Sequence, residues 1–167
     1  GYAWIITLDQ DSECPSTLIQ HLKNYADATT AIVAPRIIYR GNEKFAKNVN
    51  NITEDVEWVI TSASLTNVNV WKAINGFDEQ LFIDKVDYDF CIRARRAGYR
   101  ITKVNTIYLL HELGNLRCRK IFWKTVYVTN HSAFRKYYMT RNSILAFMCM
   151  RIIFHLLIII DQFRRLR

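Results

Sequence analysis

Apolar runs rich in β-branched and aromatic residues alternate in this chain with segments of helical periodicity, and this alternation limits the possible folds more than any other feature. The apolar runs predict strands over residues 2–8, 31–39, 57–64 and 99–110, and the helical segments are 15–25, 69–75 and 87–97. Strands that alternate with helices indicate an α/β fold with a partly parallel sheet. Residues 40–55 are polar and are predicted to form a loop.

Local features refine these elements. The run at 2–8 is apolar throughout apart from Thr7 and predicts a buried strand, whereas Pro35 predicts that its own strand lies at an edge of the sheet or ends there. Segment 87–97 is the clearest helix, because it begins with acidic residues, ends with arginines and is followed by Gly98.

Charge divides the chain into two parts. Its 167 residues carry a formal net charge of +8. Residues 1–116 hold 12 Lys/Arg and 14 Asp/Glu, or −2, whereas residues 117–167 hold 11 and 1, or +10. We therefore expect a domain over 1–116 and a basic, apolar helical tail over 117–167. The four cysteines show no metal-binding spacing and no disulfide framework, which fits a reducing, cytoplasmic environment.

The loop Asp9-Gln10-Asp11 follows the first predicted strand, at the edge of an α/β sheet where ligands bind. Two carboxylates separated by one residue can both face a divalent cation, and hard oxygen ligands favour Mg²⁺ or Mn²⁺. Such an ion could bridge the phosphates of a sugar nucleotide. An acidic turn that caps the next helix explains the same residues, and for so short a pattern it is the more common explanation.

A second acidic cluster surrounds the start of the helix at 87–97 and contains Asp84, Asp87 and Asp89. A carboxylate at the mouth of a pocket can act as a general base on an acceptor hydroxyl. Helix capping and an i, i+4 pair between Asp89 and Arg93 account for the same residues without any function. His111 stands at another strand end and is a possible third metal ligand, although a solitary histidine is more often structural.

Six segments in order resemble the rhamnosyltransferase-like members of the family-two glycosyltransferases. They are LDQDS (Leu8 to Ser12), VAP (Val33 to Pro35), SASL (Ser62 to Leu65), GFDEQLFIDKVDYDFCIRARRAGYRI (Gly76 to Ile101), HELG (His111 to Gly114) and RKYYMTRN (Arg135 to Asn142). The resemblance spans nearly the whole chain and implies the GT-A fold, a Rossmann-like mixed sheet flanked by helices. It also implies an inverting transfer of a sugar from a nucleoside-diphosphate sugar to a hydroxyl of a growing cell-surface polysaccharide or a lipid-linked glycan, and rhamnose as the sugar is an inference from this resemblance alone.

The resemblance also assigns roles. It implies that Asp87 is the catalytic base, although Asp84 and Asp89 are close enough in the sequence to be confused with it, and we expect these two to contact the substrate. Asp9, Gln10 and Asp11 correspond to the motif at the diphosphate and metal, with Asp11 the stronger ligand, and His111 corresponds to a histidine near that metal. Ser62, Ala63 and Ser64 belong to the segment on the acceptor side, where Ala63 replaces a usual glycine.

The first strands of that family, which bind the nucleoside, would precede Gly1, so we expect this chain to be a C-terminal fragment that binds nucleotide poorly alone. The resemblance is compatible with either thymidine or uridine diphosphate as the nucleotide.

The tail predicts a basic amphipathic helix on an anionic membrane surface, at the cytoplasmic face, and a core helix with a solvated basic end is the structural alternative. A full membrane span is disfavoured because Arg151 would lie near its middle. No nucleic-acid-binding motif is present. Two other functions fit part of the pattern: a non-catalytic membrane-associated adaptor, and a metal-dependent hydrolase that uses the same carboxylates with water as acceptor.

Overall fold

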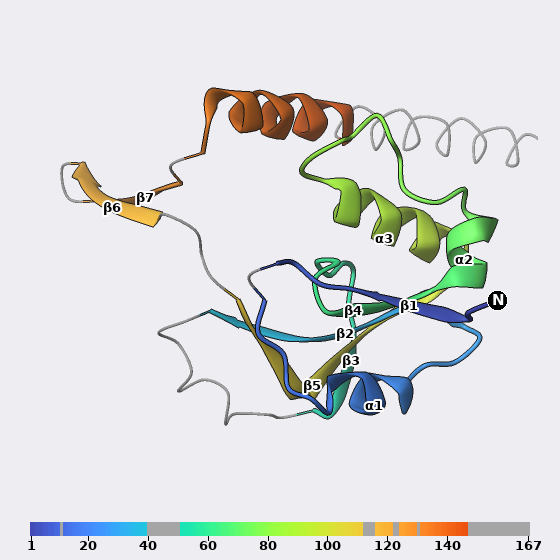
Figure 1. The fold of residues 1–167 in the computed structure, drawn as a ribbon. Coiled ribbons are helices and arrows are strands. Elements are labelled where there is room, and N and C mark those ends of the chain that lie inside the picture. Colours follow the sequence, from blue (N-terminus) through green and yellow to red (C-terminus); the bar gives the residue numbers. More distant parts are fainter. Residues whose placement is uncertain (11, 40–50, 112–115, 122–123, 130, 147–167) are drawn as a thin grey trace, which may run out of the picture. The chain divides into compact units, whose positions relative to one another are not determined.

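The computed structural model describes the chain except for residues 11, 40–50, 112–115, 122–123, 130 and 147–167, and describes only the backbone of the remaining residues between 116 and 129 (Figure 1). The chain forms two compact units. The first consists of Gly1–Asp78 and Asp87–Asn130, and the second of Glu79–Val86 and His131–Arg167.

A five-stranded mixed sheet forms the centre of the first unit (Figure 1). Its order is β1 (Trp4–Thr7), β4 (Ser64–Asn67), β2 (Thr30–Tyr39), β5 (Arg100–His111) and β3 (Thr53–Asp55). Strands β2 and β5 run parallel, and the other neighbours are antiparallel. The α/β fold with a mixed sheet is therefore confirmed, and it is compatible with a Rossmann-like glycosyltransferase.

Helices cover both faces of this sheet (Figure 1). The helix α1 (Leu18–Lys23) places Leu18 and Leu22 in a core with Val33, Leu65, Val104, Ile107 and Leu109. On the other face, α2 (Val68–Ala73) and α3 (Val86–Arg96) contribute Val70, Phe90, Cys91 and Ala94 to a core with Ala31, Ile32, Ala34 and Ile101. Burial of apolar surface in these two cores holds the layers together.

The ends of α2 and α3 follow the chemistry that the sequence predicts. In α3, Asp87 and Asp89 lie in the first turn, and Arg93, Arg95 and Arg96 lie in the last. Gly98 follows with a φ of +88°, which glycine adopts without a steric penalty. Gly76 closes the turn after α2 with a φ of +67°, and its amide donates to the carbonyl of Trp71 at 2.7 Å.

Two strand predictions are wrong. Strand β2 lies between β4 and β5, so Pro35 is in a central strand rather than an edge strand. The sheet tolerates it because the pairing of β2 with β4 involves only Ile32 and Val33, and the register with β5 shifts directly after Pro35. Strand β1 is at the edge of the sheet, and its Ile5 is 52% exposed, so the strand predicted as buried is only half covered.

The predicted strand at 57–64 is also displaced, because pairing with β1 begins only at Ser64. The helical tail predicted from residue 117 begins instead as an antiparallel hairpin of β6 (Leu116–Ile121) and β7 (Lys124–Thr129). The run Thr125 to Thr129 is rich in β-branched residues, which favour strands.

Helical structure in the C-terminal region covers residues 133–146. The rest of the predicted amphipathic helix lies outside the described residues. Within the described part of the chain, no helix is both long enough and apolar enough to cross a membrane.

Candidate active site

The candidate site lies in the first unit, where the end of β1, the turn at 61–64 and the start of α3 meet. Thr7, the last residue of β1, is fixed to this turn in two ways: its carbonyl accepts from the amide of Ala63 at 2.7 Å, and its hydroxyl donates to the carbonyl of Thr61 at 2.6 Å. Asp9 therefore leaves β1 directly beside the turn.

Asp87 reaches the same turn from the first turn of α3. Its carboxylate accepts two hydrogen bonds from Thr61, one from the backbone N–H and one from the hydroxyl, both at 3.2 Å. The two bonds hold the carboxylate in a defined orientation. Because they come from a residue 26 positions earlier in the chain, the sheet and α3 must both be folded for this arrangement to exist.

The electrostatic environment of Asp87 disfavours the ionised form of its carboxyl group. Burial raises the pKa of Asp87 above its ordinary value, the two bonds from Thr61 lower it, and the negative charge of Asp9 raises it. The net direction is upward. A carboxylate with a raised pKa binds a proton more strongly, and perturbed groups of this kind are concentrated at functional sites.

Serine hydroxyls connect the turn to the backbone that follows β1. The buried Ser62 hydroxyl accepts from the amide of Asp9 at 3.2 Å and shares a hydrogen bond with the Ser12 hydroxyl at 2.9 Å. Ser64 instead donates to the carbonyl of Ile60 at 2.6 Å, just before the turn. Ser62 and Ser12 therefore hold the loop that contains Asp9 and the exposed Gln10.

Ala63 is fully buried and has a φ of +60°, in the left-handed region that costs an L-residue energy and glycine little. This conformation gives a physical reason for the glycine that is usual at this position in the family that the chain resembles. Ala63 keeps the turn in place through its amide, which is bonded to Thr7.

His111 ends β5, where its ring lies 6.2 Å from that of Tyr39, its neighbour on β2. Its Nδ1 atom is buried and makes no hydrogen bond within the structure as described. Glu13 pairs with Leu110 in an isolated bridge, so the loop that follows β1 runs to the end of β5, one residue from His111.

These residues fit a divalent cation in their chemistry, since carboxylate oxygens with one imidazole suit Mn²⁺, and the buried Nδ1 of His111 has no hydrogen-bond partner among the residues that the structure describes. Asp11, the predicted principal ligand, lies outside the described residues. Among the residues that are described, no group of three or more His, Cys, Asp or Glu side chains is arranged to hold a metal ion. The metal site therefore stays a prediction.

The other two acidic candidates have structural partners. Asp89 forms an ion pair with Arg93 at 2.7 Å, as the i, i+4 spacing predicts, and Arg93 also donates to the carbonyls of Ile74 and Gly76. Asp84 belongs to the second unit, where Arg135 donates to its carboxylate at 3.3 and 3.4 Å. Direct substrate contacts by Asp84 and Asp89 stay predictions.

Thr61, the residue that orients Asp87, is not among the residues that the sequence predicts for the site. The run Thr61-Ser62-Ala63-Ser64 offers a signal, since successive hydroxyls are typical of turns in which side chains bond to the backbone. Nothing in the sequence indicates which carboxylate, 26 residues away, would accept from Thr61.

Comparison with known proteins finds a distant similarity to a sugar transferase. The chain is 27% identical over 161 residues to a protein of Shigella flexneri described as dTDP-rhamnosyl transferase RfbF. This similarity supports a rhamnosyltransferase-like glycosyltransferase. The match covers 87% of the chain and 53% of RfbF, so the chain spans about half the length of the curated relative that it matches. No protein-family model matches the chain.

Proposed function

We propose that this chain forms part of an inverting glycosyltransferase that transfers a sugar, rhamnose, from a nucleoside-diphosphate sugar to a hydroxyl of a growing cell-surface polysaccharide or lipid-linked glycan. The main structural support is the position of Asp87, a half-buried carboxylate with a raised pKa that Thr61 orients beside the loop of Asp9. The similarity to RfbF supports the choice of dTDP as the nucleotide and of rhamnose as the sugar.

The reaction needs one base and one leaving group. The ionised carboxylate of Asp87 accepts the proton of the acceptor hydroxyl while that oxygen bonds to the anomeric carbon of the sugar. The bond from the anomeric carbon to the diphosphate breaks in the same step, and its electron pair leaves with the diphosphate. Attack from the face opposite the leaving group inverts the anomeric configuration.

The chain's own residues prepare this step. Burial of Asp87 strengthens it as a base, and Thr61 fixes the direction of its carboxylate. Ser62 and Ser12 hold the backbone of Asp9 at the end of β1. Asp9, Asp11 and His111 would hold Mg²⁺ or Mn²⁺, and such an ion supplies charge neutralisation for the departing diphosphate.

The adaptor hypothesis explains these contacts less well. Membrane binding alone does not require a half-buried carboxylate, whose ionised form burial disfavours. The hydrolase hypothesis shares the same carboxylates and differs in its acceptor. We propose peripheral association with the cytoplasmic face of the membrane as an accompanying property, supported by the +10 charge of residues 117–167.

The test of the site is calorimetric binding of Mn²⁺ by the full-length protein, with and without dTDP, in the wild type, Asp9→Ala and Asp11→Ala. We expect binding that depends on the nucleotide and is lost in Asp11→Ala. Asp55→Asn is the matched control, because Asp55 lies on β3 at the opposite edge of the sheet from β1 and pairs with Arg95. Binding that is insensitive to Asp9 and Asp11 would identify the loop as a helix cap.

A further inference from the structure

The segment Leu81–Val86 in the second unit has an unusual backbone. Phe82, Asp84 and Lys85 have φ values of +52°, +64° and +68°, although none of them is glycine. L-residues in the left-handed region are strained, and a run of three within four positions persists only where other contacts hold it. The strained segment leads directly into α3, which begins at Val86 and presents Asp87 in its first turn.

The helix at residues 133–146 supplies those contacts, and Asn142 is at their centre. Asn142 is fully buried, and its amide nitrogen donates to the carbonyls of Leu81 at 2.6 Å, Ile83 at 2.7 Å and Asp84 at 3.0 Å. A single NH₂ group thus serves three backbone acceptors of the strained segment, at least one of them through a shared proton. Among uncharged side chains, asparagine carries a two-proton amide donor at the shortest distance from its own backbone.

Two arginines of the same helix complete the arrangement. Arg141 donates to the carbonyl of Gln80 at 2.8 Å, and Arg135 pairs with the carboxylate of Asp84 through two nitrogens. Phe82 adds ring contacts with Phe134 and Tyr138, at centroid distances of 6.2 and 5.4 Å. The segment Arg135 to Asn142, which the sequence singles out without assigning it a role, thereby binds the strained segment along its length.

We propose that Asn142, assisted by Arg135 and Arg141, is a positioning residue for the transfer reaction: it holds the left-handed segment before α3 and so fixes the point at which Asp87 enters that helix. The inference rests on the proposed function, since Asp87 is the base in that proposal. It gives a role to the helix at 133–146, which contains none of the residues assigned to the chemistry.

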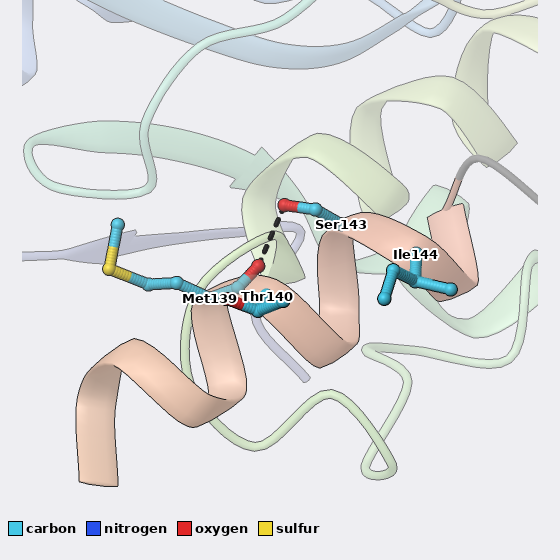
Figure 2. Close-up of a pocket in the computed structure, with 4 residues that line it drawn as sticks. All are labelled: Met139, Thr140, Ser143 and Ile144. Carbon is cyan, nitrogen blue, oxygen red and sulfur yellow. Dashed lines mark hydrogen bonds between the residues drawn. The ribbon is translucent and has the colours of Figure 1, made fainter. Parts of the chain in front are cut away.

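Steady-state kinetics of the full-length protein test the proposal. Asn142→Ala removes all three donated bonds, and we expect kcat to fall by about tenfold to a hundredfold, as misplacement of a catalytic group does, with the donor KM changed less than about twofold. Ser143→Ala is the matched control on the same helix. Its hydroxyl donates only to the helix's own Met139 carbonyl, at 2.7 Å, beside a pocket lined by Met139, Thr140, Ser143 and Ile144 (Figure 2).

Relief of the strain provides a second variant. Lys85→Gly removes the steric penalty at a φ of +68°, so in the Asn142→Ala background we expect it to restore kcat by about threefold or more. A merely structural role for Asn142 predicts no such rescue. If Asn142→Ala does not fold, Arg135→Gln replaces it, because the Arg135 side chain is 44% exposed and its loss leaves Asn142 in place.

A folded Asn142→Ala or Arg135→Gln protein with unchanged kcat would overturn the proposal, as would a loss confined to KM. Amide hydrogen exchange separates this failure from failure of the proposed function. If the wild type transfers no sugar, the transferase proposal fails, but faster exchange at residues 83–87 in Asn142→Ala would still support the clamp, and unchanged exchange would refute it.

Discussion

Removal of the Thr61 hydroxyl should raise the pH at which the proposed transfer reaction sets in. Thr61→Val keeps the shape of the side chain and the backbone N–H bond to Asp87, but deletes the bond from the hydroxyl at 3.2 Å. That bond stabilises the ionised carboxylate, so its loss raises the pKa of Asp87 further in the direction in which burial already moves it.

The size of the effect follows from the bond. A hydrogen bond to a charged group contributes about 1.5–3 kcal/mol, and the 3.2 Å distance places this one at the weaker end. Since 1.36 kcal/mol corresponds to one pKa unit, a contribution of about 1.5 kcal/mol gives a rise of roughly one pH unit. A general base acts when it is deprotonated, so the acidic limb of the pH–activity profile should move to higher pH by about the same amount.

The assay is the pH dependence of kcat/KM for nucleoside diphosphate release, which reports the pKa of the base in the free enzyme. Thr61→Ser retains the hydroxyl and is the matched control, with an acidic limb close to that of the wild type. An acidic limb that stays in place in Thr61→Val, or that moves equally in Thr61→Ser, would refute the assignment of Asp87 as the titrating base held by Thr61.

Three further changes have expected outcomes. Asp87→Asn should lower the rate of sugar transfer by about a hundredfold or more. Because the pKa of Asp87 is raised in the folded state, ionisation of its carboxyl group lowers the stability of the wild type as the pH rises through that pKa. Thermal melting should therefore find Asp87→Asn at least as stable as the wild type at pH 7, and the difference in stability should vanish in acid. Ala63→Gly should raise the free energy of unfolding by about 1 kcal/mol in denaturant titration, since it relieves a φ of +60°; an unfolding midpoint at or below that of the wild type would contradict this. Gly76→Ala should lower the free energy of unfolding by about 2–3 kcal/mol, because the added Cβ would lie 2.7 Å from the Trp71 side chain. Gly98→Ala has open space around the added Cβ and should lower the free energy of unfolding by only about 1 kcal/mol in the same titration. Equal decreases for the two variants would show that the contact with Trp71 does not matter.

Sequence patterns predict best those features that depend on neighbouring residues. The helix at 87–97 is predicted almost to the residue, because its charges and the glycine at 98 act within a turn of each end. Features that depend on distant partners are predicted poorly. Pro35 argues for an edge strand, and only the pairing pattern of β2, with its register shift, explains why a central strand accepts it.

The same distinction holds for the site. Asp9 and Asp87 are predictable from their places at a strand end and a helix start, but the contact that makes Asp87 a candidate base comes from Thr61. The bonds from Asn142 to the strained segment span about 60 residues, so the sequence shows the segment Arg135 to Asn142 and the loop at 81–84 without indicating that they meet.

The most direct test of the transferase account is the release of nucleoside diphosphate from dTDP-rhamnose by the full-length protein with a glycan acceptor, compared between the wild type and Asp87→Asn, with the anomeric configuration of the product determined by NMR. The account predicts release that requires the acceptor, a product of inverted configuration, and a loss of about a hundredfold or more in Asp87→Asn. Release that proceeds with water alone, or that Asp87→Asn leaves unchanged, would contradict it.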